Sequence, residues 1–248
     1  MTATDKPIKA VLFDLDGTLL DTEALSDKAM LAVFRDQLPE DLWQSYASEG
    51  YRLPWELKKQ LLGLRGSEWA PIVISYARDV WKIADHNLPT VTELWQGWEE
   101  KLNEYCEEVE KCTGASELVE RFAAAGIPMA IATSSRAASV AKKRTRHGPL
   151  FDRIQVIVPG DHPLVQEGKP APDIYLEAAR QMGVDPTECL VVEDALSGVK
   201  SGKAAGCRVI AIPDPRFTTE EKQSFVQEAD YVIDDLSQFD GTLFGLNI

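Results

Sequence analysis

The sequence lacks the features of secreted and membrane-spanning proteins. It holds only four cysteines, Cys106, Cys112, Cys189 and Cys207, and no two of them form a C-x-x-C pair. This usage favours a reduced, intracellular compartment over a disulfide framework. No run approaches about 18 apolar residues without charges, so no membrane-spanning helix is expected.

The N-terminal segment and the charge balance set further limits. The segment MTATDKPIKA lacks the apolar core of a signal peptide, so we expect a cytoplasmic protein. An organelle-targeting segment that has been removed remains an alternative. The formal net charge is −14. A nucleic-acid-binding protein needs a basic face to neutralise phosphates, so this charge argues against that role. A small anionic substrate stays compatible with it, because one local cation cluster or a metal ion suffices.

The apolar pattern predicts an α/β fold with a parallel sheet. From Gly114 onwards short apolar runs alternate with helical patterns, and an earlier run, KAVLFD, ends at Asp14. This alternation is typical of βαβ units, in which helices cover both faces of the sheet. The expected strands are 9–14, 127–133, 154–158, 189–193, 208–212 and 231–233, and the expected helices are 115–125, 135–147, 172–182 and 197–205.

Residues 22–108 are expected to form an all-helical insert. Apolar residues such as Ile72 and Tyr76 recur there at helical spacing. All six tryptophans of the chain lie in this stretch, outside any alternating strand pattern. The sequence therefore predicts a core domain of residues 1–21 and 109–248 and a helical domain between them.

A set of polar side chains stands at the ends of the expected strands and in one loop. Its members are, in chain order, Asp14, Asp16, Thr133, Ser134, Lys169, Glu193 and Asp194. In open parallel sheets, ligands bind beyond the carboxyl ends of the strands. Each motif alone could be a turn, a helix cap or a loop. Their order at successive strand ends favours a functional site.

The acidic members of this set indicate metal-assisted phosphoryl chemistry. Gathered carboxylates repel one another unless a cation neutralises them, and Mg²⁺ prefers oxygen ligands and substrate phosphates. We therefore expect Mg²⁺ as cofactor. Asp14 can act as a nucleophile that forms an aspartyl-phosphate, and Asp16 as general acid and base. Lys169, Thr133 and Ser134 would hold the phosphoryl oxygens.

At these residues the sequence resembles the haloacid dehalogenase-like (HAD) hydrolase superfamily. Residues 14–19, DLDGTL, resemble its first motif, Thr133 its second, Lys169 its third, and Glu193 with Asp194 its fourth. The resemblance implies a Rossmann-like core whose helical insert is a C1-type cap that closes over the site.

The resemblance also implies roles for the motif residues. Asp14 would be the nucleophile and Asp16 the acid and base. The metal ligands would be Asp14, the backbone carbonyl of Asp16, and Asp194. Glu193 would bind the metal directly or through water. An aspartate at position 16 favours phosphatases and phosphomutases over dehalogenases.

A narrower resemblance covers residues 160–174. This stretch is similar to the pseudouridine-5'-phosphatase-like group, whose relatives include glycerol-phosphate phosphatases and an FMN phosphatase domain. His162 stands where the group has aspartate, and Tyr175 where it has phenylalanine. Neither residue belongs to the four motifs, so the expected chemistry is unchanged.

The favoured function is a Mg²⁺-dependent phosphatase for a small phosphorylated metabolite, with pseudouridine 5'-phosphate as first candidate. Glycerol phosphate, FMN and sugar phosphates are alternative substrates. A second hypothesis is a phosphomutase of the β-phosphoglucomutase kind, which shares all four motifs. A third is a non-enzymatic metabolite-binding protein, but the four intact motifs argue against it. No nucleic-acid or membrane partner is expected, and a monomer is the default.

Several residues outside the motifs are also candidates for a role at the site, but each has a plain structural explanation as well. Arg65, in a Gly-Leu-Arg-Gly turn, is either a substrate contact from the helical insert or a solvated loop arginine. Glu23 is interpreted as a first-turn glutamate favoured by the helix dipole. The basic run 142–147 is interpreted as a solvated helix face, and the tryptophans as the core of the insert.

Overall fold

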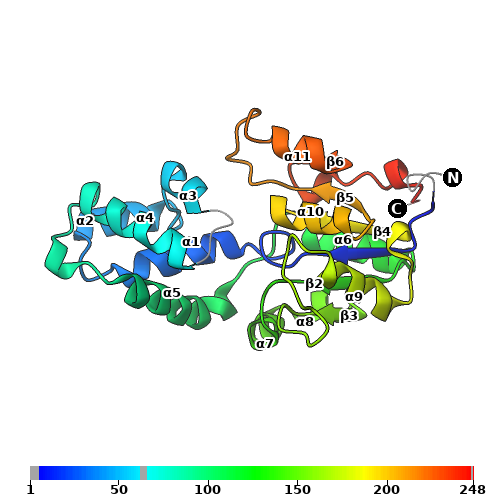
Figure 1. Cartoon of the computed structure of the whole chain (residues 1–248), viewed down its shortest axis with the longest axis horizontal. Helices are drawn as coiled ribbons and strands as arrows, with labels where there is room; N and C mark the ends of the chain where they lie inside the picture. The colour runs from blue at the N-terminus through cyan, green and yellow to red at the C-terminus, as the bar shows by residue number, and fades with distance from the viewer. Residues whose placement is uncertain (1–5, 62–65, 247) are drawn as a thin grey trace. The chain divides into compact units, whose positions relative to one another are not determined.

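Two units make up the chain, which Figure 1 shows coloured from its N-terminus to its C-terminus. The structure is a computed structural model and describes residues 6–61, 66–246 and 248. The sheet unit is Met1–Asp21 with Glu110–Ile248, and the helical unit is Thr22–Val109. In the described part of the chain, no helix combines the length and the apolar character needed to cross a membrane.

The sheet unit is built on a parallel sheet. Its strands are β1 (Ala10–Phe13), β2 (Met129–Ala132), β3 (Val156–Val158), β4 (Cys189–Glu193), β5 (Arg208–Ala211) and β6 (Tyr231–Val232). Their order is β3-β2-β1-β4-β5-β6, and every neighbouring pair is parallel. The chain builds outward from β1 first to one side and then to the other. Such a reversal of strand order marks the place where open α/β sheets bind ligands.

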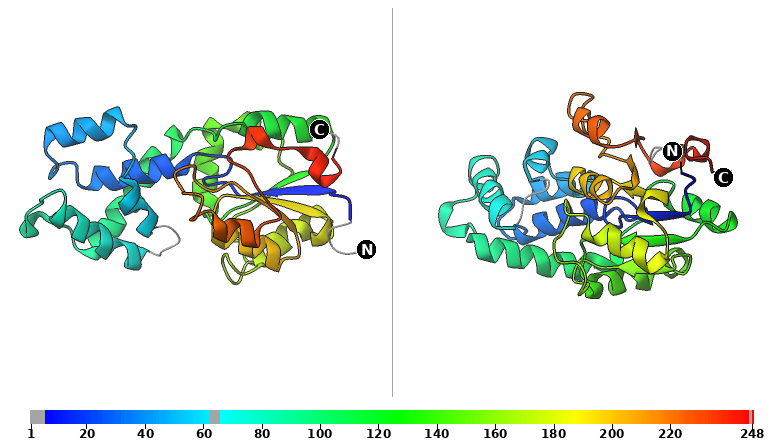
Figure 2. Two further views of the ribbon diagram at one scale, coloured as in Figure 1. Left: turned by 90° about the horizontal axis from the view of Figure 1, so that it is seen from above. Right: turned by 45° about the vertical axis from the view of Figure 1, so that its right-hand side comes forward.

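Helices cover both faces of this sheet (Figure 2). They are α6 (Ala115–Ala124), α7 (Ala137–Arg146), α8 (Gly148–Phe151), α9 (Asp173–Met182), α10 (Leu196–Ala204) and α11 (Gln223–Glu228). The described part of the unit also contains the 3₁₀ turns η4 (Pro186–Glu188), η5 (Leu236–Gln238) and η6 (Gly241–Phe244). These elements confirm the α/β fold with a parallel sheet.

Successive strand residues point to opposite faces, and both faces are buried. On one face, residues of α9, α10 and α11 share a core with Leu12 and Val191. On the other face, Phe122 of α6 packs edge-on against Phe13 and Phe239. Burial on both sides explains why β1 and β4 are apolar runs without polar alternation.

The helical unit contains α1 (Thr22–Val33), α2 (Glu40–Ser48), α3 (Trp55–Leu61), α4 (Gly66–Asp79), η2 (Asp85–Asn87), α5 (Val91–Tyr105) and η3 (Cys106–Glu108). Its described residues form no strand, as expected. The local sequence determines where α5 begins. Thr90 and Glu93 form a capping box that satisfies backbone N–H groups of the first turn.

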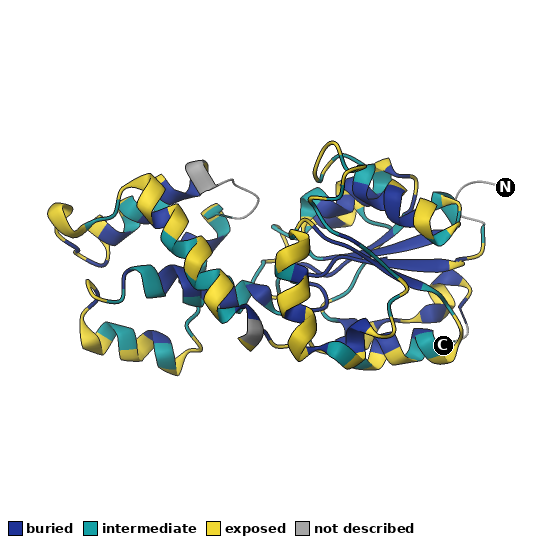
Figure 3. Cartoon of the chain, turned by 90° about the horizontal axis from the view of Figure 1, so that it is seen from below, coloured by how far each residue is buried: buried dark blue, intermediate teal, exposed yellow. Residues whose placement is uncertain are grey.

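Aromatic side chains such as Phe34, Trp69 and Trp81 belong to the core of the helical unit. Figure 3 shows buried and exposed residues alternating along its helices. Trp69 and Trp81 are buried, and Trp81 donates its ring N–H to the hydroxyl of Tyr46 at 2.9 Å. The interpretation of the tryptophans as core is confirmed for these two and is wrong for Trp95, which is exposed. Glu23 lies in the first turn of α1.

Candidate active site

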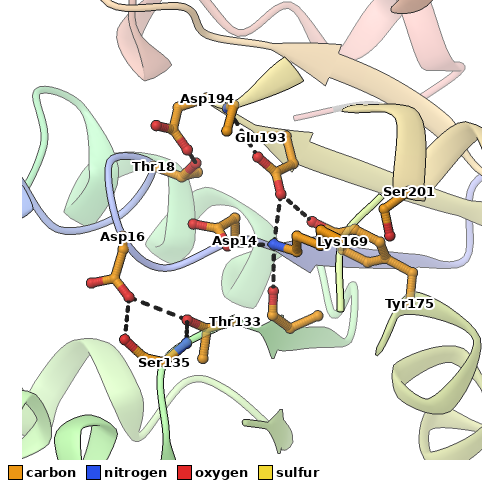
Figure 4. A network of polar contacts seen from close by, with 12 residues as sticks. Asp14, Asp16, Thr18, Thr133, Ser135, Lys169, Tyr175, Glu193, Asp194 and Ser201 are labelled. Atoms are coloured by element: carbon orange, nitrogen blue, oxygen red, sulfur yellow. Dashed lines mark hydrogen bonds and ion pairs between the residues drawn. The ribbon is translucent and has the colours of Figure 1, made fainter. Parts of the chain in front are cut away.

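The predicted motifs meet at the carboxyl end of the parallel sheet (Figure 4). Asp14 directly follows β1, Thr133 directly follows β2, and Glu193 is the last residue of β4. Because β1 pairs with both β2 and β4, these residues come from three neighbouring strands. Lys169 reaches into the same place from the loop before α9.

Lys169 lies at the centre of a buried polar network. Its Nζ donates hydrogen bonds to Asp14 Oδ1 at 2.5 Å, Glu193 Oε1 at 2.6 Å and the carbonyl oxygen of Ala132 at 3.1 Å. The side chains of Lys169, Asp14 and Glu193 are at most 8% exposed. A lysine ammonium has three N–H donors, so each of them has an acceptor here. One cation thus binds two carboxylates.

Burial and neighbouring charges shift the pKa values of Asp14 and Lys169. Burial raises the pKa of Asp14 to about 7, with Lys169 acting against the rise and Glu193 and Asp16 adding to it. Burial alone would lower the pKa of Lys169, but Asp14 and Glu193 raise it above its ordinary value. Lys169 therefore stays charged, while Asp14 is costly to ionise. A further cation beside Asp14 would relieve this cost.

Asp16 is directed toward α7. Its Oδ2 accepts hydrogen bonds from the hydroxyls of Ser135 at 2.6 Å and Thr133 at 3.2 Å, and its Oδ1 pairs with the ammonium of Lys143. Burial alone would raise the pKa of Asp16, but Lys143 and the two hydroxyls outweigh it and lower the pKa. The carboxyl is thereby held in its ionised form.

The interpretation of residues 142–147 as a solvated helix face is wrong for Lys143. It is buried in the structure, and besides its ion pair with Asp16 its Nζ donates to Ser135 Oγ at 3.0 Å. Val140, three residues earlier on α7, is also buried, and residues three apart share a helix face. That spacing from Val140 is the sequence signal that could have indicated a buried lysine.

The carboxylate of Glu193 is held on both of its oxygens. Its Oε1 accepts from Lys169 and from the hydroxyl of Tyr175 at 2.8 Å, and its Oε2 accepts from the backbone N–H of Ala195 at 3.1 Å. The helix α10 approaches so closely that a Cβ on Gly198 would lie 1.7 Å from Oε1. The carboxylate therefore faces Lys169.

The loop after β1 and Asp194 provide hard oxygen atoms of the kind that Mg²⁺ prefers. Asp194 Oδ1 accepts from the hydroxyl of Thr18 at 3.2 Å, and a Cβ on Gly17 would lie 2.2 Å from Asp194 Oδ2. In the described residues no group of three or more His, Cys, Asp or Glu side chains is arranged to hold a metal ion. Asp14, Asp194 and the carbonyl of Asp16 would fit Mg²⁺, which commonly takes one or two carboxylates and completes its shell with water and phosphate.

Two further predicted residues, Ser134 and Arg65, are not part of the network of contacts described above. Ser134 is exposed, and its carbonyl oxygen lies so near Gly160 that a Cβ there would be 2.4 Å away. Arg65 lies outside the described residues. Ser135 and Tyr175 belong to the network without having been predicted for it. For Ser135 the signal was the second serine of the Thr-Ser-Ser run, and for Tyr175 it was the departure from the phenylalanine that the resemblance implies there.

Comparison with known proteins identifies the class to which this fold and site belong. The family model described as haloacid dehalogenase-like hydrolase matches residues 11–212. The chain therefore belongs to the haloacid dehalogenase-like hydrolase family. This confirms the resemblance read from the motifs, and with it the expectation of a hydrolytic enzyme.

Individual relatives cover nearly the whole chain. The Arabidopsis thaliana protein named "(DL)-glycerol-3-phosphatase 1, mitochondrial" is 34% identical over 99% of this chain and 77% of its own length. The Drosophila melanogaster protein named "Probable pseudouridine-5'-phosphatase" is 32% identical over 95% of this chain and 93% of its own. A crystal structure of a HAD family hydrolase from Deinococcus radiodurans, with bound phosphate and sodium, covers 96% of both chains at 26% identity and a TM-score of 0.71.

Proposed function

We propose that this protein is a Mg²⁺-dependent phosphatase that hydrolyses a small phosphomonoester through an aspartyl-phosphate on Asp14. The observation that carries the proposal is the buried ammonium of Lys169, which bonds to both Asp14 and Glu193 at the strand ends. A fixed cation beside a carboxylate nucleophile suits phosphoryl transfer, whose transition state spreads negative charge over three oxygens. The phosphatase names of the relatives support the same class.

In the first chemical step, the phosphoryl group would lie beside Lys169, with Thr133 and Ser134 lining its site. Asp14 attacks phosphorus in line, so a bond from its carboxylate to phosphorus forms as the bond to the leaving alcohol breaks. Asp16 gives a proton to the leaving oxygen. Because Lys143 favours the ionised form of Asp16, Asp16 has to loosen this contact to carry that proton.

In the second step, water attacks phosphorus and releases Asp14 and inorganic phosphate. Asp16, ionised again, takes a proton from the water. The contacts of Asp16 with Ser135 and Lys143 suit this step, because they stabilise the ionised carboxylate that acts as base.

The metal site is proposed from the donor set described above. Asp14, Asp194 and the backbone carbonyl of Asp16 would hold Mg²⁺, and Glu193 would serve mainly as the partner of Lys169. When bound, the ion neutralises the charge on the attacking carboxylate and on the phosphoryl group. We further propose that the helical unit serves as the cap domain that the family resemblance implies.

The substrate is proposed to be a phosphorylated metabolite of the size of a nucleotide or smaller. Pseudouridine 5'-phosphate and glycerol 3-phosphate come first, because relatives matched over most of their length carry these names. FMN and sugar phosphates follow as further candidates. A phosphomutase would instead keep the phosphoryl group on its product.

Release of inorganic phosphate from a panel of these esters and p-nitrophenyl phosphate, with and without Mg²⁺, tests the proposal. We expect Mg²⁺-dependent release, which EDTA abolishes, and a loss of at least about 1,000-fold in kcat for Asp14→Asn, because the nucleophile is gone. Turnover of Asp14→Asn near that of the wild type would contradict the assignment. Conversion between phosphosugar isomers without phosphate release would favour the mutase.

A further inference from the structure

We infer that Tyr175 is a positioning residue of this active site, whose hydroxyl fixes Glu193 and thereby holds the ammonium of Lys169 beside Asp14. The inference rests on the phosphatase function proposed above. It adds a residue outside the four motifs.

Tyr175 contacts both members of one ion pair. It lies in the first turn of α9 and is fully buried. Its hydroxyl donates to Glu193 Oε1 at 2.8 Å, and the Nζ of Lys169 lies 5.0 Å from the centroid of its ring. Figure 4 shows the phenol directed at the point where Lys169 and Glu193 meet. A cation over an aromatic face is itself stabilised, so the ring and the hydroxyl act on the same pair.

The hydroxyl matters because Glu193 would otherwise be less constrained. An ionised carboxylate only accepts hydrogen bonds, so the phenol must be the donor. Together with the N–H of Ala195 on Oε2, it holds the carboxylate at both ends. A phenylalanine at 175 would leave Oε1 to Lys169 alone and would let the carboxylate turn.

A fixed Glu193 determines which bond Lys169 gives up when substrate arrives. All three donors of Lys169 have acceptors, so a phosphoryl oxygen has to replace or share one of them. The carbonyl of Ala132 is part of β2, and Glu193 is held by Tyr175. The bond to Asp14 is therefore the one exchanged, which frees the carboxylate oxygen that attacks. Tyr175 acts on this exchange through Glu193 and Lys169 and does not touch the reacting atoms.

The variant Tyr175→Phe removes the hydroxyl and keeps the ring. We expect kcat to fall about tenfold, as for the loss of one hydrogen bond to a charged group, while KM changes less than about twofold. Inhibition by orthovanadate, which imitates the five-coordinate phosphorus, should weaken by the same factor, and binding of inorganic phosphate should change little. Tyr46→Phe, which loses a buried hydroxyl inside the helical unit, is the matched control and should keep kcat.

A double-mutant cycle with Lys169→Ala separates positioning from a general loss of structure. If Tyr175 acts through Lys169, Tyr175→Phe should have almost no effect in the Lys169→Ala background. The same tenfold loss in both backgrounds, or an unchanged kcat in the single variant, would overturn the inference. A wild type that releases no phosphate would instead contradict the proposed function. In that case weaker vanadate binding to Tyr175→Phe would still support the inference, and unaltered or absent binding would overturn it.

Discussion

Individual residues show how charge is distributed around the proposed nucleophile. Two lysines from different parts of the chain each hold one carboxylate of the DLDGT motif: Lys169 holds Asp14, and Lys143 holds Asp16. Both lysine side chains are 6% exposed. Buried charges persist only when they are paired, so each lysine depends on its aspartate as much as the aspartate depends on the lysine.

Substitution of Lys143 by Met tests this pairing. The variant leaves Asp16 without its cation, and we expect a loss of about 2 kcal/mol in the free energy of unfolding near pH 7. This is below the usual range for a fully buried pair, because 27% of the Asp16 side chain is exposed. The exposed neighbour Lys142, substituted in the same way, should change stability by less than about 0.5 kcal/mol.

The effect of Lys143→Met should depend on pH with a definite sign. The folded protein holds the pKa of Asp16 below its ordinary value, so Asp16 contributes stability that is present above its unfolded pKa and is lost as the pH falls through its folded pKa. The difference between wild type and variant in urea unfolding should therefore be full at pH 6–7 and shrink below about pH 4. A difference that grows toward acid pH would contradict the pairing.

At the scale of elements, the close approach of α10 to the end of β4 determines where the carboxylate of Glu193 lies. Glu193 ends the strand, and Gly198 lies in α10, where any side chain would collide with the Glu193 carboxylate. The helix and the strand can approach this closely only because position 198 carries no Cβ.

The variant Gly198→Ala is therefore expected to displace Glu193. We predict a loss of about 1–3 kcal/mol in the free energy of unfolding, as in overpacked cores, and a loss of at least about tenfold in kcat because Lys169 loses its bond to Glu193. Gly148→Ala is the matched control, since no atom lies within 4 Å of a Cβ there. Unchanged phosphate release by Gly198→Ala would show that the position of Glu193 does not matter.

The positions of the elements were predictable to within a few residues. The expected strand at 189–193 is β4, and the expected helix at 172–182 is α9 at Asp173–Met182. Two helices, α8 and α11, were not predicted. They span four and six residues, and α11 buries only Phe225, so neither shows a repeating apolar pattern. Short helices depend on tertiary contacts rather than on periodicity.

Among the described residues, each of the two units buries apolar side chains of its own. In the sheet unit, α9, α10 and α11 pack on one face of the parallel sheet and α6 packs on the other, and in the helical unit a core lies among α1 to α5. Leu94 is fully buried in the helical unit, and Leu190 is fully buried in β4. We therefore expect each unit to open by local unfolding of its own core.

Hydrogen exchange of two leucine variants tests this separation. Leu94→Ala and Leu190→Ala should each cost about 2–5 kcal/mol in the unit that carries the change. Exchange should accelerate mainly in α1, α4 and α5 for Leu94→Ala and mainly in β1, β4 and β5 for Leu190→Ala, because contiguous cooperative units open separately. Equal acceleration across both units in either variant would show that the chain unfolds as one cooperative body.

Residue types and their order predicted which residues meet at the end of the sheet, whereas the contacts between these residues depended on the fold. Asp14, Asp16, Thr133, Lys169 and Glu193 could be picked out because strand ends of a parallel sheet bring such residues together. The partners of these residues could not. Lys143 belongs to a basic run that is typical of a solvated surface, and Tyr175 lies outside the four motifs. Which atom each carboxylate contacts depends on side-chain direction and on the close approach of α10, and these are set by packing between segments far apart in the chain.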